Sequence, residues 1–203
     1  MIAASILIPE FPVLKPLVLA AAIALLSSPA TAAPVAYELD PTHTNVVASW
    51  NHLGFSNPVA HFGDVDGTLV YDAENVAASS VEVTIPVAGV DGHSDRFNTH
   101  LRSADLFDLA AFPHITFRST QVESTGADTL RITGALTIRG VTKTVVLDAT
   151  LNGAGKHPMS GRPAIGFDAT TTVKRSDFGL DYALPAVSEE IAIRITTEGV
   201  AAS

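Results

Sequence analysis

Histidine is the residue type in this chain with the widest chemical scope, because neutral imidazole is a common metal ligand. The sequence contains seven, at positions His43, His52, His61, His93, His100, His114 and His157. No two of them are two residues apart, as ligands on one face of a strand would be, or four apart, as on a helix. Only the fold could bring three together around an ion. The spacing therefore predicts no metal site.

Other catalytic groups lack a motif that would position them. Asp64 and Asp66 flank a turn before Gly67, and paired carboxylates can serve acid–base catalysis. The same residues also end strands at glycine turns, which is the interpretation we favour. The chain has no G-x-S-x-G elbow and no phosphate-binding glycine loop. It has no cysteine, which excludes thiol catalysis, Cys-ligated zinc and disulfides. We therefore predict no catalytic residue and no cofactor.

The segment at residues 98–117, NTHLRSADLFDLAAFPHITF, favours a binding function instead. It is rich in apolar and aromatic residues but is interrupted by Asp105, Asp108 and Pro113, so it cannot form one long strand. The pattern predicts helical turns at 94–101 and 104–111, followed by a strand at 114–119. Such a segment can act as a lid over an apolar ligand. The predicted ligand contacts of this lid are Phe97, in the first helical turn, together with Leu101, Phe107 and Phe112.

Aromatic composition supports an apolar interior. The chain has nine phenylalanines and only three tyrosines, although ordinary core packing uses the same residues. Each buried methylene contributes about 0.8 kcal/mol, so a tail with about a dozen buried carbons could reach submicromolar affinity after the cost of ordering. The predicted tunnel residues are Trp50, Phe55, Phe62, Ile115, Phe117, Leu136, Ile138, Phe167 and Phe178. Candidate head-group contacts at the mouth are Asn51, His52, Asn98, His100 and Arg102.

The elements that must hold these residues are strands, because apolar and polar residues alternate with period two along most of the chain. The pattern predicts about eight antiparallel strands, at 45–50, 67–71, 81–85, 114–119, 130–138, 141–151, 165–173 and 191–195. One apolar and one polar face suit an antiparallel sheet, and closing the sheet removes its edges. A barrel of this size can enclose one small ligand. Arg139-Gly140 is predicted to form a hairpin turn, with the glycine at positive φ.

The stretch Val173–Leu180 is predicted to mark a change from strand to loop. We expect the charges of Arg175 and Asp177 to fix this transition and Phe178 to turn inward.

Charge and the N-terminal residues bear on location and partners. The net charge is −9, which does not attract nucleic acid or anionic lipid surfaces. Lys15 precedes the apolar run 17–26, and Ala30-Thr31-Ala32 supplies small residues for cleavage. Residues 1–32 are therefore predicted to be a secretory signal peptide, cut after Ala32, with an apolar run too short to span a membrane. Residues 33–203 would form one soluble domain.

Six stretches of the sequence resemble the YceI-like polyisoprenoid-binding proteins, a periplasmic family. They occur in the family's order and extend over nearly all of residues 33–203. They are Asp40–Thr44, Asn51–Ser56, His100–Asp108, Phe112–Phe117, Leu136–Lys143 and Arg175–Leu180. The resemblance implies an extended, lipocalin-like antiparallel β-barrel with a tunnel for an isoprenoid or other long-chain amphiphile. It implies no established enzymatic activity.

The chain departs from the family pattern at two places. Asn98 stands where the family usually has aspartate, which removes a charge near the lid. Leu106 and Phe107 stand where it often has two phenylalanines, which keeps the site apolar.

The sequence thus favours an all-β, single-barrel periplasmic carrier of a long-chain lipid. An exposed strand could pair two barrels as a homodimer, and the sequence leaves that open. Two alternatives stay open. An enzyme acting on a lipid or quinone-like substrate would need a reactive polar cluster in the same pocket. A ligand-free, stress-related structural protein would have a filled barrel without a tunnel.

Overall fold

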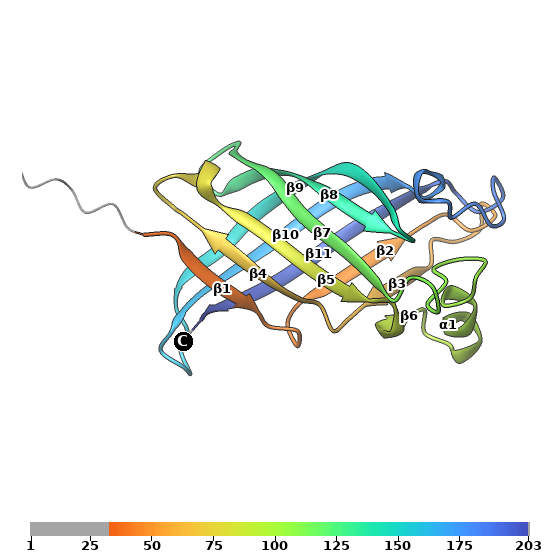
Figure 1. The fold of residues 1–203 in the computed structure, drawn as a ribbon, viewed down its shortest axis with the longest axis horizontal. Coiled ribbons are helices and arrows are strands. Elements are labelled where there is room, and N and C mark those ends of the chain that lie inside the picture. The colour runs from red at the N-terminus through yellow and green to blue at the C-terminus, as the bar shows by residue number, and fades with distance from the viewer. Residues whose placement is uncertain (1–32, 203) are drawn as a thin grey trace, which may run out of the picture. The chain divides into compact units, whose positions relative to one another are not determined.

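The computed structural model describes residues 33–202, in which eight strands form a closed antiparallel barrel (Figure 1). The predicted signal peptide lies outside the described residues. β11 pairs with both β10 and β1, and this last pairing closes the sheet on itself. Around the barrel the strands are β1 (Val35–Leu39), β4 (Asp66–Tyr71), β5 (Ser80–Pro86), β7 (His114–Ser124), β8 (Thr129–Ile138), β9 (Val141–Lys156), β10 (Pro163–Lys174) and β11 (Glu190–Ala201). The predicted fold class is confirmed.

Three further strands extend the sheet beyond the barrel. They are β2 (Asn45–Ser49), β3 (Val59–Phe62) and β6 (Val90–Asp91), which follow β11 in that order. β11 pairs with β2 through residues 192–196 and with β1 through residues 199–201, so β1 and β2 lie end to end along one strand. The predicted set of eight included β2 and omitted β1, β3 and β6. β3 and β6 have only four and two residues, too short for alternation to show, whereas β1 was missed although it is as long as β2.

The hairpin between β8 and β9 has the predicted geometry. Arg139 and Gly140 both have positive φ, 50° and 73°, and Ile138 pairs with Val141 across the turn. Two central residues with positive φ give the turn that matches the right-handed twist of the flanking strands. This turn is therefore confirmed.

One helix lies after β6. The helix α1 (Asp95–Leu101) begins at Ser94, whose hydroxyl accepts a hydrogen bond from the amide of Phe97, and Asp95 in its first turn favours the positive end of the helix dipole. The second predicted helical segment, 104–111, is wrong. It is a series of turns in which Asp108 has a φ of 49° and the amide of Phe107 donates to the carbonyl of Leu101. This left-handed residue breaks the regular helical hydrogen bonding.

On most barrel strands alternate residues point inward and are less exposed than their neighbours, as the period-two pattern predicts. On β8 these are Leu130, Ile132, Gly134, Leu136 and Ile138. The glycine has a packing reason, because a Cβ atom at position 134 would lie 2.3 Å from Cζ of Phe117 on β7. The Phe117 ring therefore lies across the glycine, inside the barrel.

The turn between β1 and β2 contains a charged pair. Nδ1 of His43 lies 2.7 Å from Oδ2 of Asp40, and the amide of Thr42 donates to the other carboxylate oxygen. The hydrogen bond to His43 is the main cause that lowers the pKa of Asp40, and the same bond raises the pKa of His43 above 6.5. The pair stabilises the turn when Asp40 is ionised and His43 is protonated. Its contribution is lost as pH falls through the lowered pKa of Asp40 or rises through the raised pKa of His43.

We predict that replacing Asp40 with Asn moves the titration midpoint of His43 downward, toward its ordinary value. An NMR pH titration of the imidazole protons measures this directly. Asp66→Asn, a change of an exposed carboxylate at the start of β4, is the control and should leave His43 unchanged. An unchanged midpoint in Asp40→Asn would contradict the assignment.

Candidate functional site

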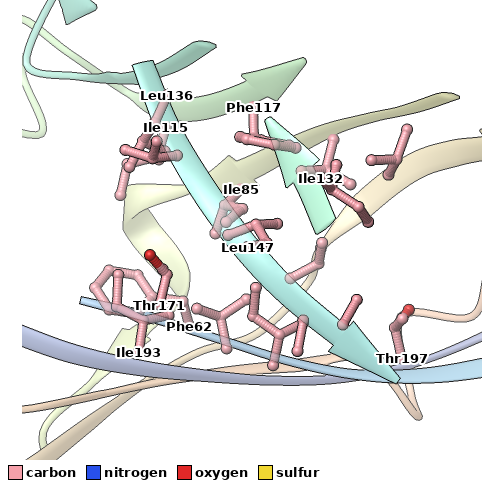
Figure 2. Close-up of a pocket in the computed structure, with 18 of the residues that line it drawn as sticks. Phe62, Ile85, Ile115, Phe117, Ile132, Leu136, Leu147, Thr171, Ile193 and Thr197 are labelled. Carbon is pink, nitrogen blue, oxygen red and sulfur yellow. The ribbon is translucent and has the colours of Figure 1, made fainter. Parts of the chain in front are cut away.

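A cavity of about 200 Å³ lies inside the barrel (Figure 2). Its walls are mostly aliphatic and aromatic side chains from nearly every strand, among them Phe62, Ile85, Ile115, Phe117, Ile132, Leu136, Leu147 and Ile193. Among the few polar lining groups, Thr197 is satisfied by a 2.8 Å hydrogen bond between its hydroxyl and that of Thr44. An interior of this kind favours apolar groups and offers few hydrogen bonds to a polar one.

A larger cleft of about 890 Å³ adjoins this cavity. It lies between α1, the loop after β2 and the loop between β10 and β11, which gather at one end of the barrel (Figure 1). Cavity and cleft share part of their walls, namely Ala48, Phe62, Phe107, Arg175, Leu180 and Ile191. Because the two hollows share these wall residues, the cleft is the side from which a ligand could enter the barrel interior.

Three aromatic contacts link α1 and the turns that follow it to the cleft. Trp50 meets Phe97 with ring centroids 5.8 Å apart. His100 meets Tyr182 edge-on at 4.8 Å. The third contact is Phe62 with Phe107 at 5.4 Å, and both rings line the cavity as well as the cleft. These rings pack the lid against the barrel end, and hydrogen bonds from Asn98 to Asp91 and from Arg102 to Val90 tie it to β6 as well.

Arg175 is the main polar group at the junction of cavity and cleft. Its side chain is only 6% exposed. Nε donates to the carbonyl of Ser188, Nη1 to those of Leu180 and Tyr182, and Nη2 to that of Val187. Burial lowers the pKa of its guanidinium from the ordinary value. Arg175 thus fixes the loop between β10 and β11.

The sequence predicted that the charges of Arg175 and Asp177 would fix the change from strand to loop within Val173–Leu180. In the structure, Arg175 has this role. Asp177 forms no ion pair with any residue of the described chain. Phe178 does turn inward, with 2% of its surface exposed. The loop is therefore fixed by hydrogen bonds to its carbonyls.

The structure brings most of the predicted binding residues together. Those that line the cavity are Phe62, Phe107, Ile115, Phe117, Leu136, Ile138, Phe167 and Phe178. Those that line the cleft include Trp50, His52, Phe97, His100 and Leu101.

Five predicted residues lie outside both hollows. Phe55 is 90% exposed in the loop after β2. Phe112 packs near Gly140, where an added Cβ would lie 2.9 Å from its ring. The other three are polar and hold local structure: Asn51 accepts from the amide of Gly54, Asn98 accepts from that of Gly92, and Arg102 donates to the carbonyl of Val90.

Several lining residues had no signal in the sequence. Arg96 and Tyr182 line the cleft, and both lie in segments without strand periodicity. Arg175 lines both hollows although the sequence indicated only a structural role. Aliphatic members such as Ile132 and Leu147 could have been found from alternation alone, because they share inward faces with predicted residues.

The histidines and carboxylates form no metal centre within residues 33–202. The fold does bring His61 and His93 together, with ring centroids 5.1 Å apart. Asp64 has a φ of 54° in the turn before β4, and Asp66 begins that strand. In the same part of the chain, no helix is long and apolar enough to cross a membrane.

Comparison with known sequences gives a consistent result. A family model described as a YceI-like domain matches residues 37–199. Protein YceI from Escherichia coli O6:H1 is 41% identical over 178 residues, which cover 87% of this chain and 92% of that protein. A UPF0312 protein from Azotobacter vinelandii is 41% identical over 171 residues, covering 84% and 88%.

Solved structures share the fold. Campylobacter jejuni YceI protein superposes with a TM-score of 0.66 at 31% identity, covering 75% of this chain and 90% of that one. BcnA from Burkholderia cenocepacia has a TM-score of 0.72 at 24% identity, covering 79% and 98%. A polyisoprenoid-binding domain from Saccharophagus degradans has a TM-score of 0.64 at 16% identity, covering 83% and 99%. The last two likenesses concern the fold alone.

Proposed function

The chain belongs to the YceI-like domain family, and from that premise we propose that it reversibly binds a long-chain isoprenoid or a similar amphiphilic lipid. The observation that carries the proposal is the apolar cavity that shares a wall with a cleft under a lid. The lipid tail would occupy the cavity and its polar head would lie in the cleft, near His52 and His100. The polyisoprenoid-binding domain from Saccharophagus degradans, which shares the fold, supports this class of ligand.

The sizes of the two hollows indicate how such a ligand would sit. Ligand pockets commonly measure about 300–1,000 Å³. The cavity, at about 200 Å³, is smaller than that, whereas the cleft of about 890 Å³ falls within it. A long lipid would therefore occupy both hollows, with the edge-on contact of Phe62 and Phe107 opening to let it pass.

A carrier function is proposed in preference to an enzymatic one. The cleft lining has imidazoles and a phenol, at His52, His100 and Tyr182, but Ser56 and Ser94 are its only aliphatic hydroxyls among the described residues. No side-chain hydrogen bond joins either serine to a histidine in that part of the chain. The predicted signal peptide supports a periplasmic location, in which the protein would carry, store or buffer its lipid.

The direct test is to purify the protein from its native compartment, extract it with organic solvent and identify the extract by mass spectrometry. We expect one long-chain isoprenoid or related lipid, near one per protein molecule and chemically unchanged after incubation. A protein that is purified empty and ignores added prenyl lipids would refute the proposal. Conversion of the bound lipid would favour an enzyme.

We predict that Phe107→Ala speeds lipid dissociation by about tenfold or more. The ring lines both the cavity and the cleft and packs on Phe62. Truncating an aromatic ring at such a contact removes buried apolar surface that contributes about 2 kcal/mol. Stopped-flow transfer of a fluorescent prenyl lipid to acceptor vesicles measures the rate. Phe112→Ala is the matched control, because that ring lines neither hollow. Equal rates in wild type and Phe107→Ala would contradict a gate at this ring.

A further inference from the structure

Two loops at the entrance of the cleft expose large apolar side chains. Leu53 and Phe55, in the loop after β2, are 50% and 90% exposed, and Tyr182, in the loop between β10 and β11, is 52% exposed. The loops are joined, since the amide of Leu53 donates to the carbonyl of Ala186. We call residues 50–58 and 182–188 the rim. Exposed apolar side chains concentrated at one place indicate an interaction surface.

The charge of the rim differs from that of the rest of the chain. The whole chain carries a net charge of −9, yet residues 49–61 and 182–188 contain no Asp, Glu, Lys or Arg. The cleft enclosed by the rim is lined by Arg96, Arg175 and two histidines, and no carboxylate lines it. Asp95 directly precedes Arg96 and Asp181 directly precedes Tyr182, but neither carboxylate lines the cleft. The rim itself thus has no charged side chain and the cleft lining is cationic, while Asp95 adjoins Arg96 in sequence and the charge of Asp181 acts on Arg175.

We propose that the rim docks on the surface of a phospholipid bilayer, with Leu53, Phe55 and Tyr182 at the lipid–water interface and Arg96 toward the phosphates. Aromatic residues favour that interface, and arginine favours lipid phosphates. In this orientation the cleft faces the bilayer, and a water-insoluble ligand could move from the bilayer through the cleft into the cavity. The inference rests on the proposed function, because only a lipid cargo requires the entrance to face a membrane.

The chain offers a matched control for the exposed rim residues. Met159 is 91% exposed. It lies in the turn between β9 and β10, where Lys156 pairs with Pro163, whereas the rim adjoins the other end of β10, where Lys174 pairs with Glu190 (Figure 1). Removing Met159 therefore removes exposed apolar surface at the end of the barrel away from the cleft.

The experiment measures co-sedimentation of the full mature protein with vesicles of zwitterionic phosphatidylcholine, because a chain with a net charge of −9 is repelled by an anionic surface. Trp50 is the only tryptophan in the chain and lines the cleft, so its emission gives a second reading of docking. We expect wild type and Met159→Ser to bind equally. In the double variant Leu53→Ser/Phe55→Ser, the partition coefficient for vesicles should fall about tenfold or more, because two exposed apolar side chains that would leave water on docking are gone.

Two results would overturn the docking proposal: wild type that does not bind vesicles, or a double variant that binds as tightly as wild type. A loss in Met159→Ser equal to that in the double variant would also refute it. Solvent extraction of the same double variant keeps the two proposals separate. Retained lipid with lost docking leaves the carrier function intact, whereas an empty wild-type protein would refute the carrier function itself.

Discussion

Ala169→Phe is expected to weaken lipid binding about 100-fold while the barrel stays folded. Ala169 is 8% exposed, lies on β10 opposite Ile195 of β11, and lines the cavity. A phenyl ring at this position would extend into the space of about 200 Å³ that the tail needs. Excluding about four methylenes of the tail removes about 3 kcal/mol of binding, which weakens affinity about 100-fold.

The ring also fills empty volume, so the free energy of unfolding should change by no more than about 1–3 kcal/mol, the usual range for overpacking. Native mass spectrometry and displacement of a fluorescent prenyl lipid measure occupancy, and urea denaturation measures stability. Val146→Phe adds the same ring to the outer face of β9, where Val146 is 42% exposed, and should bind lipid normally. Full occupancy in folded Ala169→Phe would place the ligand outside the cavity.

Arg175→Met is expected to cost about 3–5 kcal/mol of unfolding free energy, the largest stability effect we predict. Four carbonyls, those of Leu180, Tyr182, Val187 and Ser188, accept hydrogen bonds from this one guanidinium. Hydrogen bonds from a charged donor each contribute about 1.5–3 kcal/mol, and buried carbonyls left without a partner are penalised. Part of this loss is recovered because Met needs no desolvation of a charge.

Urea denaturation measures the total loss of unfolding free energy, and amide hydrogen exchange shows which segment of the chain is destabilised. Amides of the loop between β10 and β11, such as that of Val187, should exchange faster than those of β10 itself. Arg175→Lys should recover little, because one ammonium cannot reach four carbonyls in a fixed planar arrangement. Arg194→Met removes an exposed ion pair with Asp168 and should change stability by less than about 1 kcal/mol. A similarly small effect for Arg175→Met would show that the loop is held by other contacts.

The barrel could be predicted from the sequence because its strands are long enough for alternation to show. β8 has 10 residues with one buried face, and β9 has 16 residues, of which Leu147 and Ala149 are buried on one face. β3 and β6 have only four and two residues, so an alternating pattern cannot be distinguished in them. No local pattern predicts them. The helical prediction for 104–111 was wrong because apolar spacing does not reveal a left-handed residue such as Asp108.

The candidate site could be predicted where it is built from strands and not where it is built from loops. Phe117 and Leu136 line the cavity because their inward direction follows from alternation. Phe55 has the right chemistry, but a loop position does not fix the direction of a side chain, and it points to solvent. Tyr182 lines the cleft only because Arg175 holds its loop in place. No repeating pattern in the sequence predicts that the position of Tyr182 depends on a hydrogen bond from Arg175.

The pairing of β11 with β1, β2 and β10 has a consequence for how the chain folds. Tyr37 pairs with Ala201, so the contact that closes the barrel joins residues near opposite ends of the described chain. β1 can pair with β4 and β2 with β3 early, but neither has its second partner until β11 has left the ribosome, and an incomplete chain exposes sheet edges that other chains could pair with. Contacts this distant in sequence fold slowly, on the millisecond-to-second scale of β-rich domains. A slow-closing barrel gives an export pathway or a chaperone time to engage the chain while it is still unfolded.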